Sequence, residues 1–141
     1  MKLHFPELVF PAAHYIPGQG GKCEGVHGHN YIVRDLTIDF GSNFKLNDAG
    51  MIVDFGVIKG YFKDEWDHKL IVPDIHTTQW IDFIGRMGIL LNLRPLKFTT
   101  CEWMAETVRA ELTILMKEQD NINDCIITLS LYEGPNQDVM V

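Results

Sequence analysis

The sequence predicts an α+β fold, in which an antiparallel sheet of two hairpins carries two main helices on one face. Three observations predict it: apolar and polar residues alternate in 31–40, apolar residues recur at helical spacing after residues 54 and 99, and strand-like runs occupy both ends. The chain has 141 residues and no internal repeat or linker. We therefore expect one domain spanning residues 1–141.

The first hairpin is predicted from residues 3–15 and 31–40. Pro6 and Pro11 interrupt the first of these runs, so we expect an edge strand or a bulged one. In the second run one face is expected to carry Ile32, Leu36, Ile38 and Phe40. The intervening loop is rich in turn-forming residues, which allows the chain to reverse there: Pro17, Gly18, Gly20 and Gly21.

The middle of the chain predicts a short strand and a helix. Residues 51–53 are expected to complete a third strand, and Asp54 to cap a helix that continues to about Trp66. The apolar stripe of this helix is Phe55, Ile58, Phe62 and Trp66. A short helix over residues 78–87 is expected next, followed by an extended piece.

A second long helix is predicted to begin at Thr99. Thr99 and Glu102 fit a capping box, in which Glu102 reaches back to the backbone of the cap. The apolar stripe of this helix is Met104, Val108, Leu112 and Leu115. Residues 125–132 predict the last strand, which ends at Glu133-Gly134-Pro135.

Composition excludes several classes of protein. The net charge of −7 and the pI near 5.2 argue against a nucleic-acid partner, which favours a basic surface. No apolar run approaches the roughly 20 residues that span a bilayer, and no signal peptide is evident. Three cysteines without CxxC spacing make a disulfide framework unexpected. We expect a reduced, cytoplasmic protein without a membrane partner.

Three histidines near the start predict a metal site. His27 and His29 lie two positions apart, so an extended segment places both rings on one face, and the turn-rich loop returns His14 beside them. Three neutral imidazoles suit Zn²⁺ with a fourth position open for water or substrate, as in catalytic sites. Cys23 leaves three interpretations open: a fourth ligand that closes the site, a base or nucleophile beside the metal, or an inert thiol.

Motifs in one order along the chain resemble the 6-pyruvoyltetrahydropterin synthase family, which includes the queuosine-pathway 6-carboxytetrahydropterin synthase. They are FPAAH at 10–14, CEGVHGHNY at 23–31, VDF at 53–55, Asp67-His68 with Leu70, TTCEWMA at 99–105 and YEG at 132–134. The resemblance implies the tunnelling fold, with trimers or hexamers that form a barrel. The long stretch between Leu70 and Thr99 looks like an insertion seen in other relatives.

The resemblance also implies roles for particular residues. The zinc ligands would be His14, His27 and His29, and Cys23 would be the general base. Asp67 would orient His68, the second proton-transfer group, and a neighbouring subunit would contribute this pair. Glu133 would anchor the pterin ring and take part in the proton relay, because a carboxylate accepts paired N–H donors.

The activity implied is that of a zinc-dependent lyase acting on 7,8-dihydroneopterin triphosphate. We favour 6-carboxy-5,6,7,8-tetrahydropterin as the product, with release of triphosphate and acetaldehyde, on a general expectation for small members of the family. One alternative keeps the side chain, as in 6-pyruvoyltetrahydropterin synthase; another uses Glu24 to make 6-hydroxymethyl-dihydropterin. A non-catalytic pterin-binding or zinc-binding domain is the alternative of a different class.

Overall fold

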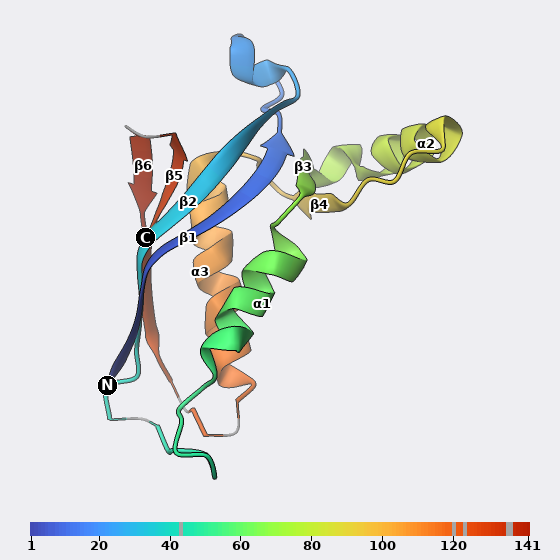
Figure 1. The fold of residues 1–141 in the computed structure, drawn as a ribbon. Coiled ribbons are helices and arrows are strands. Elements are labelled where there is room, and N and C mark those ends of the chain that lie inside the picture. Colours follow the sequence, from blue (N-terminus) through green and yellow to red (C-terminus); the bar gives the residue numbers. More distant parts are fainter. Residues whose placement is uncertain (43, 120, 123, 135–136) are drawn as a thin grey trace.

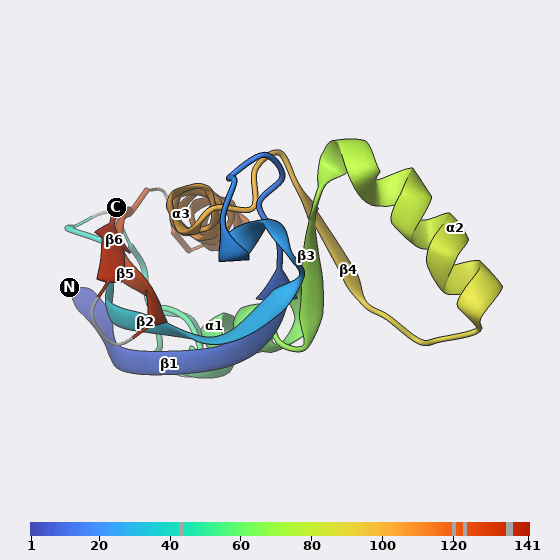
Figure 2. The same ribbon diagram turned by 90° about the horizontal axis from the view of Figure 1, so that it is seen from above.

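The computed structural model describes residues 1–42, 44–119, 121–122, 124–134 and 137–141. Within them a six-stranded sheet has the order β4-β3-β1-β2-β5-β6. The strands are β1 Lys2–His14, β2 His27–Asp39, β3 Lys69–Pro73, β4 Leu93–Leu96, β5 Ile126–Gly134 and β6 Gln137–Met140. The α-helices are α1 Phe55–Glu65, α2 Thr77–Met87 and α3 Cys101–Lys117, and two 3₁₀ turns are η1 Lys22–Glu24 and η2 Asp74–His76. The sheet curls around α3, and α1 lies beside α3 (Figures 1 and 2).

The predicted first hairpin is confirmed. β1 and β2 pair antiparallel without a break in register from Lys2 opposite Asp39 to His14 opposite His27. The other side of β1 pairs with β3 only at Ala12 and Ala13, so within the described residues β1 is an edge strand over most of its length. This arrangement accommodates Pro6, because a proline cannot donate a hydrogen bond to a strand on either side.

A bulge in β2 determines which side chains face the core. Before the bulge the odd-numbered Tyr31 and Val33 are buried, whereas after it the even-numbered Leu36 and Ile38 are buried. The switch occurs at Asp35, which has a φ of 51°, and the pairing of β2 with β5 shifts register there. The prediction that Ile32 shares a face with Leu36 is therefore wrong. The bulge places the odd-numbered residues before it, including both histidines of β2, on the inner face.

The sheet is mixed rather than antiparallel throughout. β3 runs parallel to both β1 and β4, and the chain between β3 and β4 forms a crossover that contains α2. Residues 51–53 form a bend and not the expected third strand, although Ile52 and Val53 are buried. β3 and β6 are strands that the sequence did not predict. Pro135, the predicted end of the last strand, lies outside the described residues.

The first long helix begins and ends as predicted. The Asp54 side chain caps α1 by accepting a hydrogen bond from the Gly56 backbone at 2.6 Å. Ile58, Phe62 and Trp66 are buried, and the half-exposed Phe55 packs edge-on against Phe5. This stripe covers the β1 side of the core.

The N-cap of α3 is Thr100 and not Thr99. The Thr100 hydroxyl accepts from the Trp103 backbone, so the capping box expected from Thr99 and Glu102 is wrong. Thr99 is buried and bonds to the first hairpin instead. The predicted stripe of the helix is buried at Met104, Val108 and Leu112, whereas Leu115 is half-buried.

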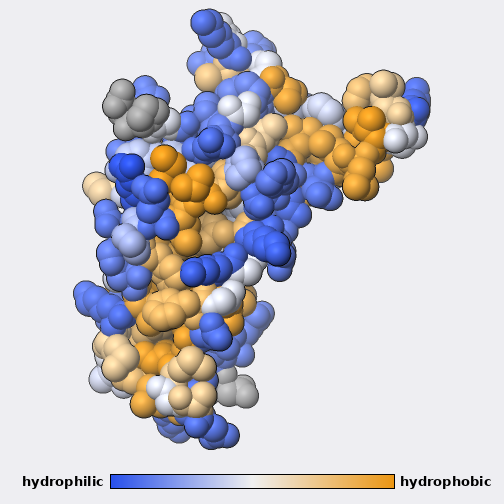
Figure 3. Space-filling model, viewed as in Figure 1, coloured by the Kyte–Doolittle hydropathy of each residue, from blue (hydrophilic) through white to orange (hydrophobic). Residues whose placement is uncertain are grey.

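The predicted short helix is confirmed as α2, and it extends away from the rest of the molecule (Figure 1). We call residues 74–92, which contain η2 and α2, the arm. α2 has no buried residue, and large apolar side chains are exposed along the arm, including Ile81, Met87 and Leu90 (Figure 3). No helix among the described residues is long and apolar enough to cross a membrane.

Candidate metal centre and active site

The three histidines converge at the loop end of the first hairpin. His14 is the last residue of β1, and the β2 register places His27 directly opposite it. One ring nitrogen from each of His14, His27 and His29 lies within 4.8 Å of the other two. The convergence expected from the spacing of the histidines is therefore confirmed.

Hydrogen bonds fix the tautomers of two of these rings. The Nδ1 atom of His14 lies 2.8 Å from the Thr99 carbonyl, and Nδ1 of His27 lies 2.8 Å from the Gly25 carbonyl. Because a carbonyl only accepts, both Nδ1 atoms carry the hydrogen of the neutral ring and both Nε2 atoms keep a lone pair. Metal-bound histidines are commonly oriented in this way.

The free nitrogens meet in a manner that fits a shared cation. The Nε2 atoms of His14 and His27 are 3.1 Å apart, and Nε2 of His29 is buried without a hydrogen-bond partner in the described part of the chain. Two unprotonated nitrogens at this distance repel each other, whereas two ligands of a tetrahedral zinc ion lie about 3.3 Å apart. The residues therefore fit a divalent metal with a preference for nitrogen ligands.

Burial keeps His14 in the form that binds metal. His14 is fully buried, and this desolvation lowers the pKa of the ring, outweighing the opposing effects of the Thr99 carbonyl and Glu133. The neighbouring His27 and His29 lower that pKa further. A neutral imidazole is the species that coordinates a metal.

Glu133 lies against the histidine cluster. Its Oε1 atom is 3.3 Å from Nε2 of His14 and accepts a hydrogen bond from the Tyr31 hydroxyl at 3.3 Å. Burial, with Glu133 as the next contribution, raises the pKa of Tyr31, so the hydroxyl remains a donor. Glu133 also lines a pocket of about 390 Å³ together with Thr100, Cys101, Glu102 and Asp138. One carboxylate thus faces both the metal cluster and a cavity.

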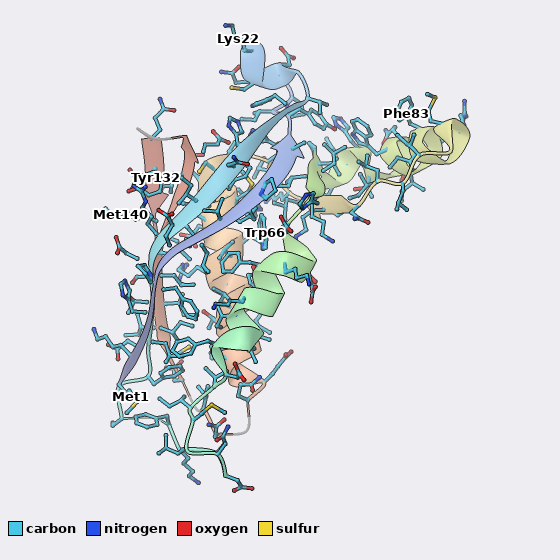
Figure 4. All side chains as sticks on the ribbon, viewed as in Figure 1. Met1, Lys22, Trp66, Phe83, Tyr132 and Met140 are labelled. Atoms are coloured by element: carbon cyan, nitrogen blue, oxygen red, sulfur yellow. The ribbon has the colours of Figure 1, made fainter. Side chains whose placement is uncertain are left out.

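Cys23 lies close to this cluster without belonging to it. It is half-buried in η1, and its carbonyl accepts from the Ile16 backbone at 2.8 Å. The Cys23 thiol is near enough to contribute to the raised pKa of Tyr31. The metal-binding group found among the described residues does not include Cys23. Figure 4 shows the neighbouring Lys22 at the tip of the loop between β1 and β2.

Asp67 and His68 lie beside the hairpin but are not bonded to the histidine cluster. Nδ1 of His68 is 2.9 Å from Asp67, and the His68 side chain is 78% exposed. The His68 backbone has a φ of 55° and donates to the Pro11 carbonyl at 2.8 Å. Within the described residues, no hydrogen bond or ion pair joins His68 to the three histidines or to Glu133. The Asp67–His68 pair is therefore not part of the bonded group formed by His14, His27 and Glu133.

His68 lines a second pocket, of about 690 Å³. Its wall includes His29 of the histidine cluster and the neighbouring hairpin residues Pro11, Ala13, Gly28 and Asn30. Trp80 and Leu91 of the arm and Lys69 of β3 also line it. The two pockets thus carry different predicted proton-transfer groups, His68 in one and Glu133 in the other.

Three residues of the centre were not predicted in these roles. Tyr31 continues the alternation of His27 and His29, a signal that was present in the sequence. The Gly25 carbonyl is two residues from His27, but the Thr99 carbonyl is 85 residues from His14. No sequence pattern indicates a contact of this second kind.

The chain belongs to the 6-pyruvoyl tetrahydropterin synthase family, whose sequence model matches residues 6–141. Among its relatives, 6-carboxy-5,6,7,8-tetrahydropterin synthase of Rickettsia felis is 40% identical over 136 residues, covering 92% of this chain and 91% of that protein. The protein of the same name from Bacillus subtilis is 39% identical over 66 residues, covering 46% of this chain and 42% of that protein. The resemblance found in the sequence is thus confirmed.

A solved structure has a similar fold. The 6-pyruvoyl tetrahydropterin synthase of Caenorhabditis elegans aligns with a TM-score of 0.56 at 17% identity, covering 100% of this chain and 94% of that one. At this level of identity the likeness concerns the fold alone. The mixed architecture of sheet and helices is therefore shared with the family.

Proposed function

We propose that this chain is a zinc-dependent lyase that converts 7,8-dihydroneopterin triphosphate to 6-carboxy-5,6,7,8-tetrahydropterin, releasing triphosphate and acetaldehyde. The observation that carries the proposal is the convergence of three histidine nitrogens beside Glu133, a residue that also lines a pocket. Relatives at 33–40% identity over 136 residues are named 6-carboxy-5,6,7,8-tetrahydropterin synthases, which supports this product.

The metal would be held by His14, His27 and His29. Zinc suits three imidazoles with an open fourth position, and it supplies Lewis acidity that makes the C–H bond beside a bound hydroxyl easier to deprotonate. The Thr99 and Gly25 carbonyls keep the ligand nitrogens directed at this point.

Glu133 would hold the pterin ring in the smaller pocket. A carboxylate offers two acceptor oxygens to the paired N–H donors of a pterin edge, and the Tyr31 hydroxyl fixes the orientation of that carboxylate. The cavity volume of about 390 Å³ lies within the range of small-molecule sites. The pterin side chain would then extend toward the histidines.

Two groups would move protons in this reaction. Cys23, in the loop beside Tyr31, would remove a proton from the substrate side chain as a thiolate, and His68 would transfer the second proton while Asp67 holds its ring. Because His68 is exposed in the other pocket, we propose that it serves the centre of a neighbouring copy. The enzyme would accordingly be a homo-oligomer, a trimer or a hexamer, with active sites between subunits.

Product analysis tests the proposal. The zinc-loaded protein is incubated with 7,8-dihydroneopterin triphosphate, the pterin is identified by mass, and acetaldehyde is assayed in parallel. We expect a carboxytetrahydropterin with one equivalent of acetaldehyde. A pyruvoyl or hydroxymethyl pterin would overturn the product assignment while keeping the site. The absence of turnover with zinc bound would make the chain a pterin-binding or zinc-binding domain.

Cys23→Ala tests whether Cys23 is the base or a metal ligand. We expect this variant to retain about one zinc ion per chain, because the three-histidine cluster is complete without Cys23. Turnover should be abolished. Loss of zinc in this variant would make Cys23 a ligand and contradict its role as the base.

A further inference from the structure

Tyr15 connects the metal-bearing hairpin to the arm. Its hydroxyl accepts a hydrogen bond from Nε1 of Trp80 at 2.9 Å and lies 2.9 Å from Nδ1 of His76. Because the indole only donates, the hydroxyl hydrogen of Tyr15 is free to be donated to His76. The Tyr15 and His76 rings are parallel within 2°. Tyr15 therefore attaches both η2 and α2.

Thr99 connects Tyr15 to the metal ligand. The Thr99 carbonyl accepts from Nδ1 of His14, and the Thr99 hydroxyl donates to the Tyr15 carbonyl. Thr99 is 2% exposed, so neither bond competes with bulk water. These two bonds hold consecutive residues of the hairpin, and a shift of Tyr15 changes the position of the carbonyl that orients His14.

The arm has little else to hold its helix in place. α2 has no buried residue. In the described parts of the chain, Trp80–Tyr15 is the side-chain hydrogen bond that joins α2 to the hairpin, and the Asp82–Arg86 pair stays within α2. The far root of the arm is fixed separately, since Arg94 of β4 pairs with Glu65 and Glu111. The position of α2 therefore depends on Tyr15.

We propose that Tyr15 couples the arm to the three-histidine centre, with Tyr15 and Thr99 acting as positioning residues for His14. This inference rests on the proposed metal site. Coupling between two sites is reciprocal, so an arm docked through Tyr15 strengthens metal binding and a bound metal stabilises the docked arm. The arm also carries Trp80 and Leu91 into the wall of the larger pocket, so its position sets the shape of that pocket.

Tyr15→Phe is the main test, because it keeps the ring and removes both hydroxyl bonds. The dissociation constant for Zn²⁺ is measured by competition with a chromophoric chelator, and we expect it to increase about tenfold, as for other groups that orient metal ligands. Hydrogen exchange of residues 77–87 is followed with and without Zn²⁺. Zn²⁺ should slow this exchange in the wild type and leave it unchanged in Tyr15→Phe.

Three further variants separate coupling from a general loosening of the arm. Arg86→Ala removes an exposed ion pair within α2 and should bind Zn²⁺ with the wild-type affinity. Thr99→Val removes the bond to the Tyr15 carbonyl and should weaken Zn²⁺ binding, whereas Thr99→Ser retains the hydroxyl and should restore it. Equal affinities in Thr99→Val and Thr99→Ser would contradict the route through Thr99.

The outcomes distinguish this inference from the proposed function. Wild-type Zn²⁺ affinity in Tyr15→Phe, or arm exchange that Zn²⁺ does not change in the wild type, overturns the coupling alone. If Tyr15→Phe does not fold, His76→Ala removes the acceptor outside the hairpin and is judged by the same two measurements. Failure of the wild type to bind Zn²⁺ would overturn the metal centre and this inference together.

Discussion

The histidine cluster and the Asp67–His68 pair are held in contrasting ways. His14 is fully buried, and its ring is fixed by the Thr99 carbonyl just before α3. The His68 ring is mostly in solvent and, among the described residues, bonds only to the neighbouring Asp67. A buried, oriented group is ready to act within its own chain. An exposed one is ready to act on another molecule. Under the proposed function, each chain would supply the histidine cluster, which we call the buried half, to one active site and the Asp67–His68 pair, the exposed half, to another.

The largest effect is expected at the buried half. His27→Ala removes one of three nitrogens that converge within 4.8 Å, so we expect loss of bound zinc and no measurable turnover. Metal content per chain is measured after dialysis. His4→Ala, on the exposed face of β1, is the matched control and should keep its zinc. Zinc retained by His27→Ala would place the metal elsewhere.

The exposed half should affect chemistry without affecting the metal. In His68→Ala we expect turnover to fall by about 10²- to 10⁴-fold, the usual contribution of a proton-transfer group. Zinc content and the melting temperature should stay at wild-type values, because the side chain is 78% exposed. A parallel loss of zinc would contradict the separation of the two halves.

Co-expression of two inactive variants decides whether the halves come from different chains. A mixed oligomer of Cys23→Ala and His68→Ala should recover about a quarter of the wild-type activity, because random assembly gives that fraction of sites with both groups intact. No recovery in a well-mixed oligomer would mean that His68 serves its own chain or is not catalytic.

The two halves also differ in how far the sequence could predict them. The HxH spacing and the turn-rich loop suffice to predict the convergence of His14, His27 and His29, because the period of a strand fixes the faces. The Thr99 carbonyl and the face switch at Asp35 depend on tertiary packing and on a bulge, which leave no periodic signal. The strands β3 and β6 were not predicted because, at five and four residues, they are too short to show a clear periodic pattern.

The role of His68 as a proton-transfer group was predicted only through the resemblance to the family. An adjacent Asp-His at the end of a helix is usually exposed, and the structure shows that it is exposed here. Nothing in the periodicity of the sequence indicates which copy of the chain it would serve. Assembly depends on contacts between chains. The periodic pattern of one sequence indicates only which side chains are buried within a single chain.

Glu133 should affect substrate binding more than the metal. Glu133→Gln retains an acceptor for the Tyr31 hydroxyl and removes the charge that would face the pterin donors. Loss of a charged hydrogen bond costs about 1.5–3 kcal/mol, so we expect KM to increase roughly 10- to 100-fold. Zinc content is measured alongside. An unchanged KM would remove Glu133 from the pterin site.

The buried half also contains a thiol that stays protonated. Burial, and next Glu133, raise the pKa of Cys101 from 9.0 to about 12. A raised pKa means that the folded state favours the neutral thiol, so this stabilisation is present below pH 9 and is lost as the pH increases toward 12. The free energy of unfolding of the wild type should fall relative to Cys101→Ser across this window. Parallel curves for the two proteins would contradict the shifted pKa.

The smallest effect is expected at Glu24, in the loop that carries Cys23. Its carboxylate accepts a hydrogen bond from the Gly18 backbone at 3.2 Å, and this exposed bond stabilises the conformation of the loop. Glu24→Ala should change the free energy of unfolding by about 0.5 kcal/mol or less, as is usual for surface substitutions. The product identified by mass should stay the same. A changed product mixture in this variant would make Glu24 a reacting group and would add the loop between β1 and β2 to the active site.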